Sequence, residues 1–135
     1  MVRITDVFVA IASLDLNRSV GFYQGFFESA PIVCHSDRYA EFHLPGLRLA
    51  IFCPNLAHRS EFESPARSAM SLCVEVADLD GAIARLVAIG YPPPGDMLTA
   101  SHGREIYAYD PDGNRLILHE AKPITSMSTT PETAR

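Results

Sequence analysis

The stretch that decides the fold is Glu105-Ile-Tyr-Ala-Tyr-Asp-Pro-Asp-Gly-Asn-Arg-Leu-Ile-Leu-His-Glu120. Two short apolar and aromatic runs flank the segment Asp110-Pro-Asp-Gly-Asn114. In that segment proline presets φ, glycine tolerates a positive φ, and the Asp and Asn side chains can bond to the turn backbone. The pattern predicts a β-hairpin, and the other strands are assigned by how they pair with it.

Length and composition limit the class of protein. A chain of 135 residues can bury a core without a metal or a disulfide as a staple. A net charge of −5 argues against nucleic acid or an anionic membrane as a partner. Three cysteines without CxxC spacing indicate buried, reduced thiols. The N-terminus lacks a signal pattern, and no apolar run approaches the ~20 residues of a membrane helix, so we expect a soluble cytoplasmic protein.

The first half of the chain predicts a β-α-β-β-β unit. Residues 4–13 form an apolar run typical of a strand covered on both faces. Asp15 is placed to cap a helix, whose apolar face consists of Leu16, Val20, Tyr23 and Phe27. Three further strands are expected at 32–35, 39–44 and 47–53, with a turn at Pro45-Gly46 between the last two.

The second half repeats this order. A strand at 71–77 precedes Asp78, which is placed to cap a helix that stops at Gly90. The apolar face of that helix consists of Leu79, Ile83, Leu86 and Val87. A weak strand at 92–100 and the opening hairpin complete the unit. We therefore predict a single domain over residues 1–121, with module one at 4–54, a polar connector at 55–67, module two at 68–121 and a polar tail at 122–135.

A family resemblance rests on three features: the doubled β-α-β-β-β unit, Asp15-Leu-Asn-Arg-Ser-Val-Gly-Phe-Tyr23 after the first strand, and Asp110-Pro-Asp-Gly-Asn114 in the last hairpin. With these the chain resembles the vicinal oxygen chelate superfamily, which includes glyoxalase I, bleomycin and fosfomycin resistance proteins and extradiol dioxygenases. The resemblance spans roughly residues 4–121. It implies an α+β fold in which two tandem modules form a curved mixed sheet around a cavity, with the helices outside. It also implies a homodimer.

The superfamily's metalloenzymes carry a metal on four inward side chains, one on the first and one on the last strand of each module. In this chain the matching positions are Phe8, Ala50, Ser71 and Ile117. Phenylalanine, alanine and isoleucine cannot coordinate a metal, and serine is a poor ligand for a divalent transition metal. We therefore expect a protein without a metal or other cofactor.

Strand alternation identifies the residues that line the expected cavity. If Ala50 and Ile117 face inward, residues two positions away on each strand do so as well. Hairpin pairing then places Tyr39, Glu41 and His43 opposite one inward set, and Tyr109, Tyr107 and Glu105 opposite the other. The residues predicted to bind a ligand are Phe8, Tyr39, Arg48, Phe52, Ser71, Glu75, Tyr107, Tyr109 and Arg115.

This lining suits a flat, partly polar organic molecule held by stacking and hydrogen bonds. The charged side chains fit equally well as a solvated rim or as cross-strand pairs, and a register shift of one residue would turn each inward set outward. Glu41 with His43, and Glu105 with His119, are the candidates for catalytic acid and base. Two donors at each place fall short of a three- or four-ligand metal site.

The function predicted from these observations is that of a metal-free small-molecule-binding protein of the glyoxalase or bleomycin-resistance type. An aromatic or partly polar ligand would lie in the cavity. One alternative is an enzyme, either a lyase or isomerase using the Glu/His pairs or a glyoxalase- or dioxygenase-like enzyme with displaced metal ligands. A purely structural or regulatory dimer is the third possibility.

Overall fold

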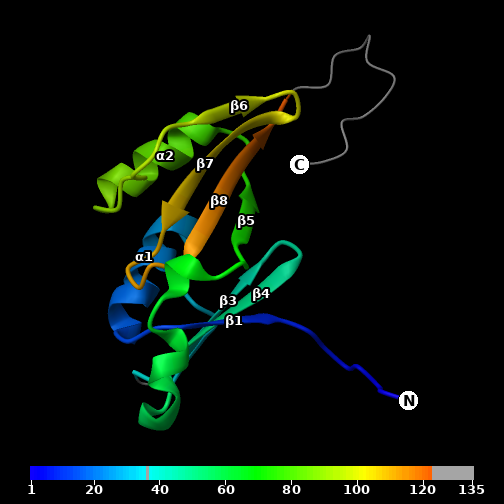
Figure 1. Cartoon of the computed structure of the whole chain (residues 1–135), viewed down its shortest axis with the longest axis vertical. Helices are drawn as coiled ribbons and strands as arrows, with labels where there is room; N and C mark the ends of the chain where they lie inside the picture. Colours follow the sequence, from blue (N-terminus) through cyan, green and yellow to red (C-terminus); the bar gives the residue numbers. More distant parts are fainter. Residues whose placement is uncertain (36, 123–135) are drawn as a thin grey trace. The chain divides into compact units, whose positions relative to one another are not determined.

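Two β-α-β-β-β units follow one another along the chain, as the internal repeat predicts (Figure 1). The structure, a computed structural model, describes residues 1–35 and 37–122. The first unit contains β1 (Val9–Ala12), α1 (Leu16–Phe27), β2 (Val33–His35), β3 (Tyr39–Leu44) and β4 (Leu47–Phe52). The second contains β5 (Leu72–Glu75), α2 (Leu79–Ala88), β6 (Leu98–Ala100), β7 (Gly103–Tyr109) and β8 (Arg115–Ala121). The connector contains the 3-10 helices η1 (Leu56–Phe62) and η2 (Pro65–Arg67).

Each unit has its own four-stranded mixed sheet. The strand orders are β1-β4-β3-β2 and β5-β8-β7-β6, with β1 parallel to β4, β5 parallel to β8, and the other pairs antiparallel. This arrangement confirms the predicted α+β class, and the cavity stays a prediction. By their contacts, residues 1–65 and 111–113 form one compact unit, and 66–110 with the described residues from 114 onward form the other. The predicted tail lies outside the described residues apart from Lys122.

Both helices begin at the aspartates predicted to cap them. Asp15 accepts a hydrogen bond from the Arg18 amide and Asp78 accepts one from the Gly81 amide, so each satisfies a backbone donor that the first helical turn leaves unpaired. α1 buries Leu16, Phe22 and Tyr23, while α2 buries Leu79 and Leu86. Val87 is 54% exposed, so its assignment to the apolar face of α2 was wrong. None of the described helices is long and apolar enough to cross a membrane.

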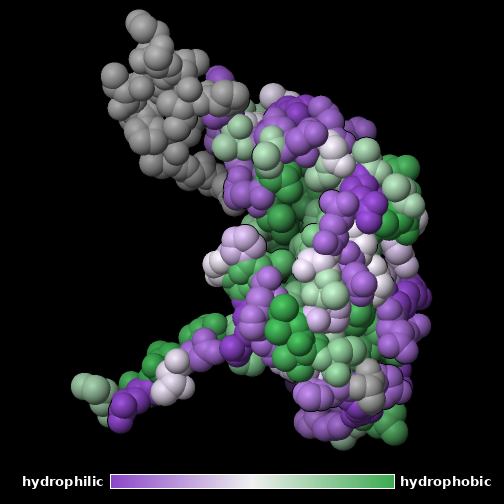
Figure 2. All heavy atoms as spheres, turned by 180° about the vertical axis from the view of Figure 1, so that it is seen from behind, coloured by the Kyte–Doolittle hydropathy of each residue, from purple (hydrophilic) through white to green (hydrophobic). Residues whose placement is uncertain are grey.

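Three local predictions differ from the structure. β1 starts at Val9 instead of Ile4, and Figure 2 shows the preceding residues as a projecting arm with polar and apolar side chains mixed along it. β6 covers only Leu98–Ala100, because Pro92-Pro93-Pro94 has no amide hydrogens to donate to a neighbouring strand. Cys34 and Cys73 are exposed, so the expectation of buried thiols was wrong for both.

The loop of the last hairpin has the predicted turn chemistry. Asp110 is 4% exposed, and its carboxylate accepts hydrogen bonds from both the backbone and the side-chain amide of Asn114, each at 2.9 Å. Gly113 has φ +96°, which favours glycine. The Asp112 carboxylate accepts from the Leu14 amide at 2.9 Å and from the Ser19 hydroxyl. Asp112 thus receives two hydrogen bonds at the start of α1, and the contacts group the loop tip with the first unit.

Each sheet has an apolar face that packs on its helix and a polar face on the opposite side. In the first unit Phe42 contacts the rings of Tyr23 and Phe27, and Leu49 and Ile51 are fully buried. The buried apolar residues of the second sheet are Ile106, Ala108, Leu116 and Leu118. Because side chains alternate along a strand, the residues between these positions lie on the face without a helix. That face is where the predicted inward residues lie.

Candidate functional site

A cluster of five side chains, here called the first-sheet cluster, lies on the helix-free face of the first sheet: Phe8, Tyr39, Glu41, His43 and Arg48. Cross-strand pairing places Tyr39 opposite Phe52, Glu41 opposite Ala50 and His43 opposite Arg48, which confirms the predicted register. Glu41 is the centre of the cluster. Its carboxylate accepts hydrogen bonds from the Tyr39 hydroxyl at 2.7 Å and from His43 Nε2 at 2.9 Å.

Arg48 combines ionic and ring contacts. Its guanidinium lies 4.2 Å from the centre of the Phe8 ring, and its Nη1 is 2.8 Å from the Asp6 carboxylate. Nε is 3.1 Å from a Glu41 oxygen, yet no acceptor in the described chain is aligned to hydrogen-bond it. The attraction between Arg48 and Glu41 is therefore ionic. Phe8 remains 42% exposed and the Arg48 side chain 33% exposed, so both stacked groups are partly accessible to solvent.

Hydrogen bonding fixes the charge states of this cluster. The bonds from His43 and Tyr39 hold the pKa of Glu41 below its ordinary value, and the charge of Arg48 acts in the same direction. The bond to Glu41 raises the pKa of Tyr39. At neutral pH the cluster therefore presents an ionised carboxylate beside a neutral phenol.

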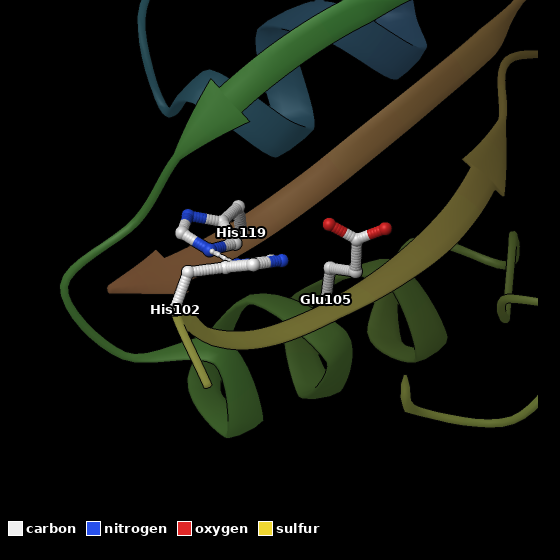
Figure 3. Close-up of side chains that lie close together, drawn as sticks. All are labelled: His102, Glu105 and His119. Atoms are coloured by element: carbon white, nitrogen blue, oxygen red, sulfur yellow. Dashed lines mark hydrogen bonds between the residues drawn. The ribbon is translucent and has the colours of Figure 1, made fainter. Parts of the chain in front are cut away.

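A second group, here called the second-sheet cluster, contains Glu75, His102, Glu105 and His119. Glu75 on β5 and Glu105 on β7 both pair with His119 on β8, so three adjacent strands supply three side chains in one row. The predicted pairing of Glu105 with His119 is confirmed. His102 comes from the turn between β6 and β7. Figure 3 shows the rings of His102 and His119 next to one another, with Glu105 beside them.

Hydrogen bonds connect three members of the second-sheet cluster in a chain. His119 Nδ1 lies 2.7 and 2.8 Å from the two Glu75 oxygens, and its Nε2 lies 3.0 Å from His102 Nδ1. An ionised carboxylate only accepts, so His119 Nδ1 carries a proton and donates it to Glu75. In the neutral ring Nε2 then accepts from His102 Nδ1. The carboxylate hydrogen-bonded to His119 is thus that of Glu75 and not that of Glu105.

The remaining predicted ligand-binding residues lie on the same faces in different surroundings. Arg115 Nε donates to the Ser71 hydroxyl at 2.6 Å, and its other nitrogens donate to backbone carbonyls of residues 66, 68 and 70. These bonds give Arg115 a structural role in holding residues 66–71, which lead into β5, against β8. Phe52 packs edge-on against Phe62 of η1, so this 3-10 helix contacts the face that α1 leaves uncovered, at the Phe52 end of β4. On β7, Tyr107 is 41% exposed and Tyr109 is half-buried.

The four family metal positions do not fit a metal ion in this structure. In the first unit, Phe8 has the positive charge of Arg48 over its ring, and Ala50 is fully buried with no donor atom. In the second unit, the Ser71 hydroxyl is engaged by the guanidinium of Arg115. A divalent cation at either first-strand position would face an arginine at close range, which costs Coulomb energy in addition to the missing ligands.

A family model described as Glyoxalase/Bleomycin resistance protein/Dioxygenase superfamily matches residues 7–118. The chain belongs to this superfamily. The predicted membership is therefore confirmed, and the superfamily's doubled module accounts for the repeat in the sequence. No curated protein matches the sequence significantly.

Solved structures with the superfamily fold are similar over most of the chain. A glyoxalase-related enzyme from Fulvimarina pelagi is 23% identical with a TM-score of 0.71, covering 97% of this chain and 100% of that one. A mutant of the fosfomycin resistance protein FosX from Listeria monocytogenes, complexed with Mn(II) and 1S,2S-dihydroxypropylphosphonic acid, is 21% identical (TM-score 0.70; 89% and 93% covered). Lactoylglutathione lyase from Agrobacterium tumefaciens is 17% identical (TM-score 0.64; 87% and 95% covered). At these identities the likeness shows the fold alone.

His102 is the one member of either cluster that sequence reasoning did not select. It is three residues before Glu105, and its backbone carbonyl accepts from the Lys122 amide just past the end of β8. Strand alternation does not apply to a residue in a turn, so its side-chain direction was not predictable from the pattern. The available signal was the His-x-x-Glu spacing of His102 and Glu105 beside the predicted partner His119.

Proposed function

We propose that this chain binds a small, flat organic molecule with hydrogen-bonding groups on the helix-free face of its first sheet. Binding occurs through side chains and without a metal ion at the four family positions. The observation that carries the proposal is the first-sheet cluster, in which an exposed ring, a stacked guanidinium and an ionised carboxylate lie together.

The chemistry of the cluster defines the ligand class. The guanidinium of Arg48 is planar, so an aromatic ligand can stack on the side that Phe8 does not occupy. Glu41 accepts two well-aligned hydrogen bonds, and a carboxylate has about four acceptor sites, so it can also accept from a hydroxyl or amide of the ligand. His43 is exposed beside it and offers a ring nitrogen. A flat molecule with a hydroxyl or amide near one edge matches these groups.

The test is a thermal-shift screen of flat aromatic compounds bearing hydroxyl, amide or carboxyl groups, in buffer containing a chelator. A ligand at about 100 times its Kd adds about 2.7 kcal/mol to the folded state, which for a chain of this size raises Tm by about 8 °C. Arg48→Ala and Phe8→Ala should each weaken binding by about 5- to 30-fold. Arg59→Ala, which removes an exposed arginine from η1, is the matched control and should bind normally.

Three outcomes count against this proposal. One is a screen in which no compound of this class stabilises the chain. Another is a ligand whose affinity is the same in Arg48→Ala, Phe8→Ala and Arg59→Ala. The third is binding that disappears with the chelator and returns when a divalent metal is added.

A second candidate function is acid–base catalysis by a lyase or isomerase. The observation that favours it is the bond between Glu75 and His119, because a carboxylate that orients an imidazole is a common arrangement for proton transfer. On the first sheet, Glu41 and His43 are the corresponding pair. Conversion of a screened compound into product, lost in His119→Ala or His43→Ala, would establish this candidate. Recovery of the ligand unchanged would favour simple binding.

The proposal includes a homodimer. It is supported by β1, an edge strand preceded by an arm with the exposed apolar side chains of Val2, Ile4 and Val7. An exposed edge of this kind favours pairing with another chain. Sedimentation that finds only a monomer of about 15 kDa at micromolar concentration would refute it.

A further inference from the structure

The second-sheet cluster brings three metal-ligating side chains together. The ligand atoms of His102, Glu105 and His119 all lie within 4.8 Å of one another. His119 is 6% exposed, whereas the other two are half-buried. The three side chains come from β7, β8 and the turn before β7 (Figure 3). Side chains from two neighbouring strands and a turn thus converge on one point, and two of the three keep part of their surface exposed.

The hydrogen bonds of the second-sheet cluster leave two ring nitrogens, His119 Nε2 and His102 Nδ1, in position to bind a cation. His119 keeps its proton on Nδ1 and donates a hydrogen bond from it to Glu75, so its Nε2 lone pair points toward His102 Nδ1 at 3.0 Å. A cation placed between these nitrogens replaces the proton that they share. His102 then takes its other neutral tautomer, with the hydrogen on Nε2, and no net proton need be released. The two nitrogens would have to move slightly apart to bind one metal ion together.

Glu75 lies where a metal-ligating histidine usually has the hydrogen-bond partner of its other ring nitrogen. Histidines that ligate metals usually donate their other ring N–H to a carboxylate, which fixes the tautomer and orientation and increases the basicity of the ligating nitrogen. Glu75 makes this contact with His119. The chain therefore supplies two imidazoles, a carboxylate and an orienting second carboxylate.

We propose that His102, Glu105 and His119 bind one divalent transition-metal ion, and that the ion is zinc. Two imidazoles and one carboxylate form a donor set that suits Zn²⁺, with a fourth position left for water or another small ligand. This site goes beyond the proposed binding of an organic molecule, because it lies on the other sheet and uses other residues. The expectation of a metal-free protein came from the four family positions, none of which belongs to this site.

Zinc titration of the full chain, stripped with a chelator and dialysed, tests the site. Isothermal titration calorimetry with zinc chloride should show saturable binding of one ion per chain. His102→Ala and Glu105→Gln should each weaken zinc binding by more than about 100-fold, and Glu75→Gln by about 10- to 100-fold.

The matched control is His58→Ala. His58 and Glu61 have the same His-x-x-Glu spacing as His102 and Glu105 and lie 2.9 Å apart, yet they are exposed on η1 with no second histidine bonded to them in the described residues. Zinc affinity should be unchanged in this variant. Circular dichroism of each variant checks that it folds.

A second measurement needs no substitution. Nitrogen-15 NMR of the imidazoles in the wild-type chain should show zinc shifting the rings of His102 and His119 while leaving His58 and His43 in place. No saturable zinc binding, equal loss of affinity in His58→Ala and His102→Ala, or zinc shifts confined to other histidines would each overturn the site. The organic-ligand screen on the first sheet is unaffected by any of these outcomes, so the two proposals fail separately.

Discussion

Replacement of Asp112 by alanine should lower the free energy of unfolding, because it removes hydrogen bonds at the start of α1. The Asp112 carboxylate accepts hydrogen bonds from the Leu14 amide and from the hydroxyl of Ser19, and Ser19 is fully buried. The Ser19 oxygen in turn accepts from Ser13 at 2.9 Å. Alanine would therefore leave a buried hydroxyl without its acceptor in the middle of a network.

The size of the effect follows from the two bonds. A buried hydrogen bond to a charged group contributes about 1.5–3 kcal/mol, whereas the exposed Leu14 amide can bond to water instead and contributes about 0.5 kcal/mol. Asp112→Ala should therefore lower the free energy of unfolding by about 2–3 kcal/mol. Asp112→Asn keeps one acceptor oxygen without the charge and should lose about half as much.

Urea denaturation followed by circular dichroism measures the change. With a slope of about 2 kcal/mol per molar urea, the midpoint of Asp112→Ala should fall by about 1–1.5 M at an unchanged slope. Asp96→Ala, which removes an exposed carboxylate from the loop before β6, is the control and should stay within about 0.5 kcal/mol of wild type. A loss below about 0.5 kcal/mol in Asp112→Ala would refute this reasoning, as would a Ser19→Ala double-mutant cycle without coupling.

Two further substitutions test the second unit. Gly103→Ala should lower the free energy of unfolding by at least about 2 kcal/mol, because a Cβ there would collide with the backbone oxygen of Glu120 and φ is +138°; an unchanged urea midpoint would contradict it. Glu120 accepts hydrogen bonds from the Leu79 amide and from Arg104, which hold its pKa below the ordinary value of a glutamate. A carboxyl whose pKa is lower in the folded state than in the unfolded state stabilises the folded protein at pH values above the unfolded-state pKa. This stabilisation is lost as pH falls through the folded-state pKa. Glu120→Gln should therefore be less stable than wild type at pH 7, and the difference should shrink as pH falls through the lowered pKa of Glu120; a pH-independent difference would be the contrary result.

The strand pairing and the face of the sheet on which each side chain lies were predictable, because the turn residues and the alternation of side chains indicate the same register. The predicted partners Glu41 and Ala50, and Glu105 and His119, are the observed ones, since each hairpin turn fixes the register of the strands beside it. The same register places the ligand candidates on the helix-free face. Whether they bind a ligand does not follow from register.

Other features of the site and of the connector depend on contacts between distant residues, which no local sequence pattern encodes. His102 lies in a turn, where side-chain direction depends on how the loop folds back toward β8. Arg115 was predicted to bind a ligand, but its bonds to the carbonyls of residues 66, 68 and 70 depend on the path of this segment. The connector has no hydrophobic period, and its 3-10 helices were missed for that reason.

The claim that metal chemistry in this chain lies outside the four family positions is tested most directly by anomalous diffraction. A crystal of the full chain soaked in zinc, measured at the zinc absorption edge, should show a peak bonded at about 2.0–2.2 Å to His102, Glu105 and His119. A peak among Phe8, Ala50, Ser71 and Ile117, or no peak on the second sheet, would contradict it.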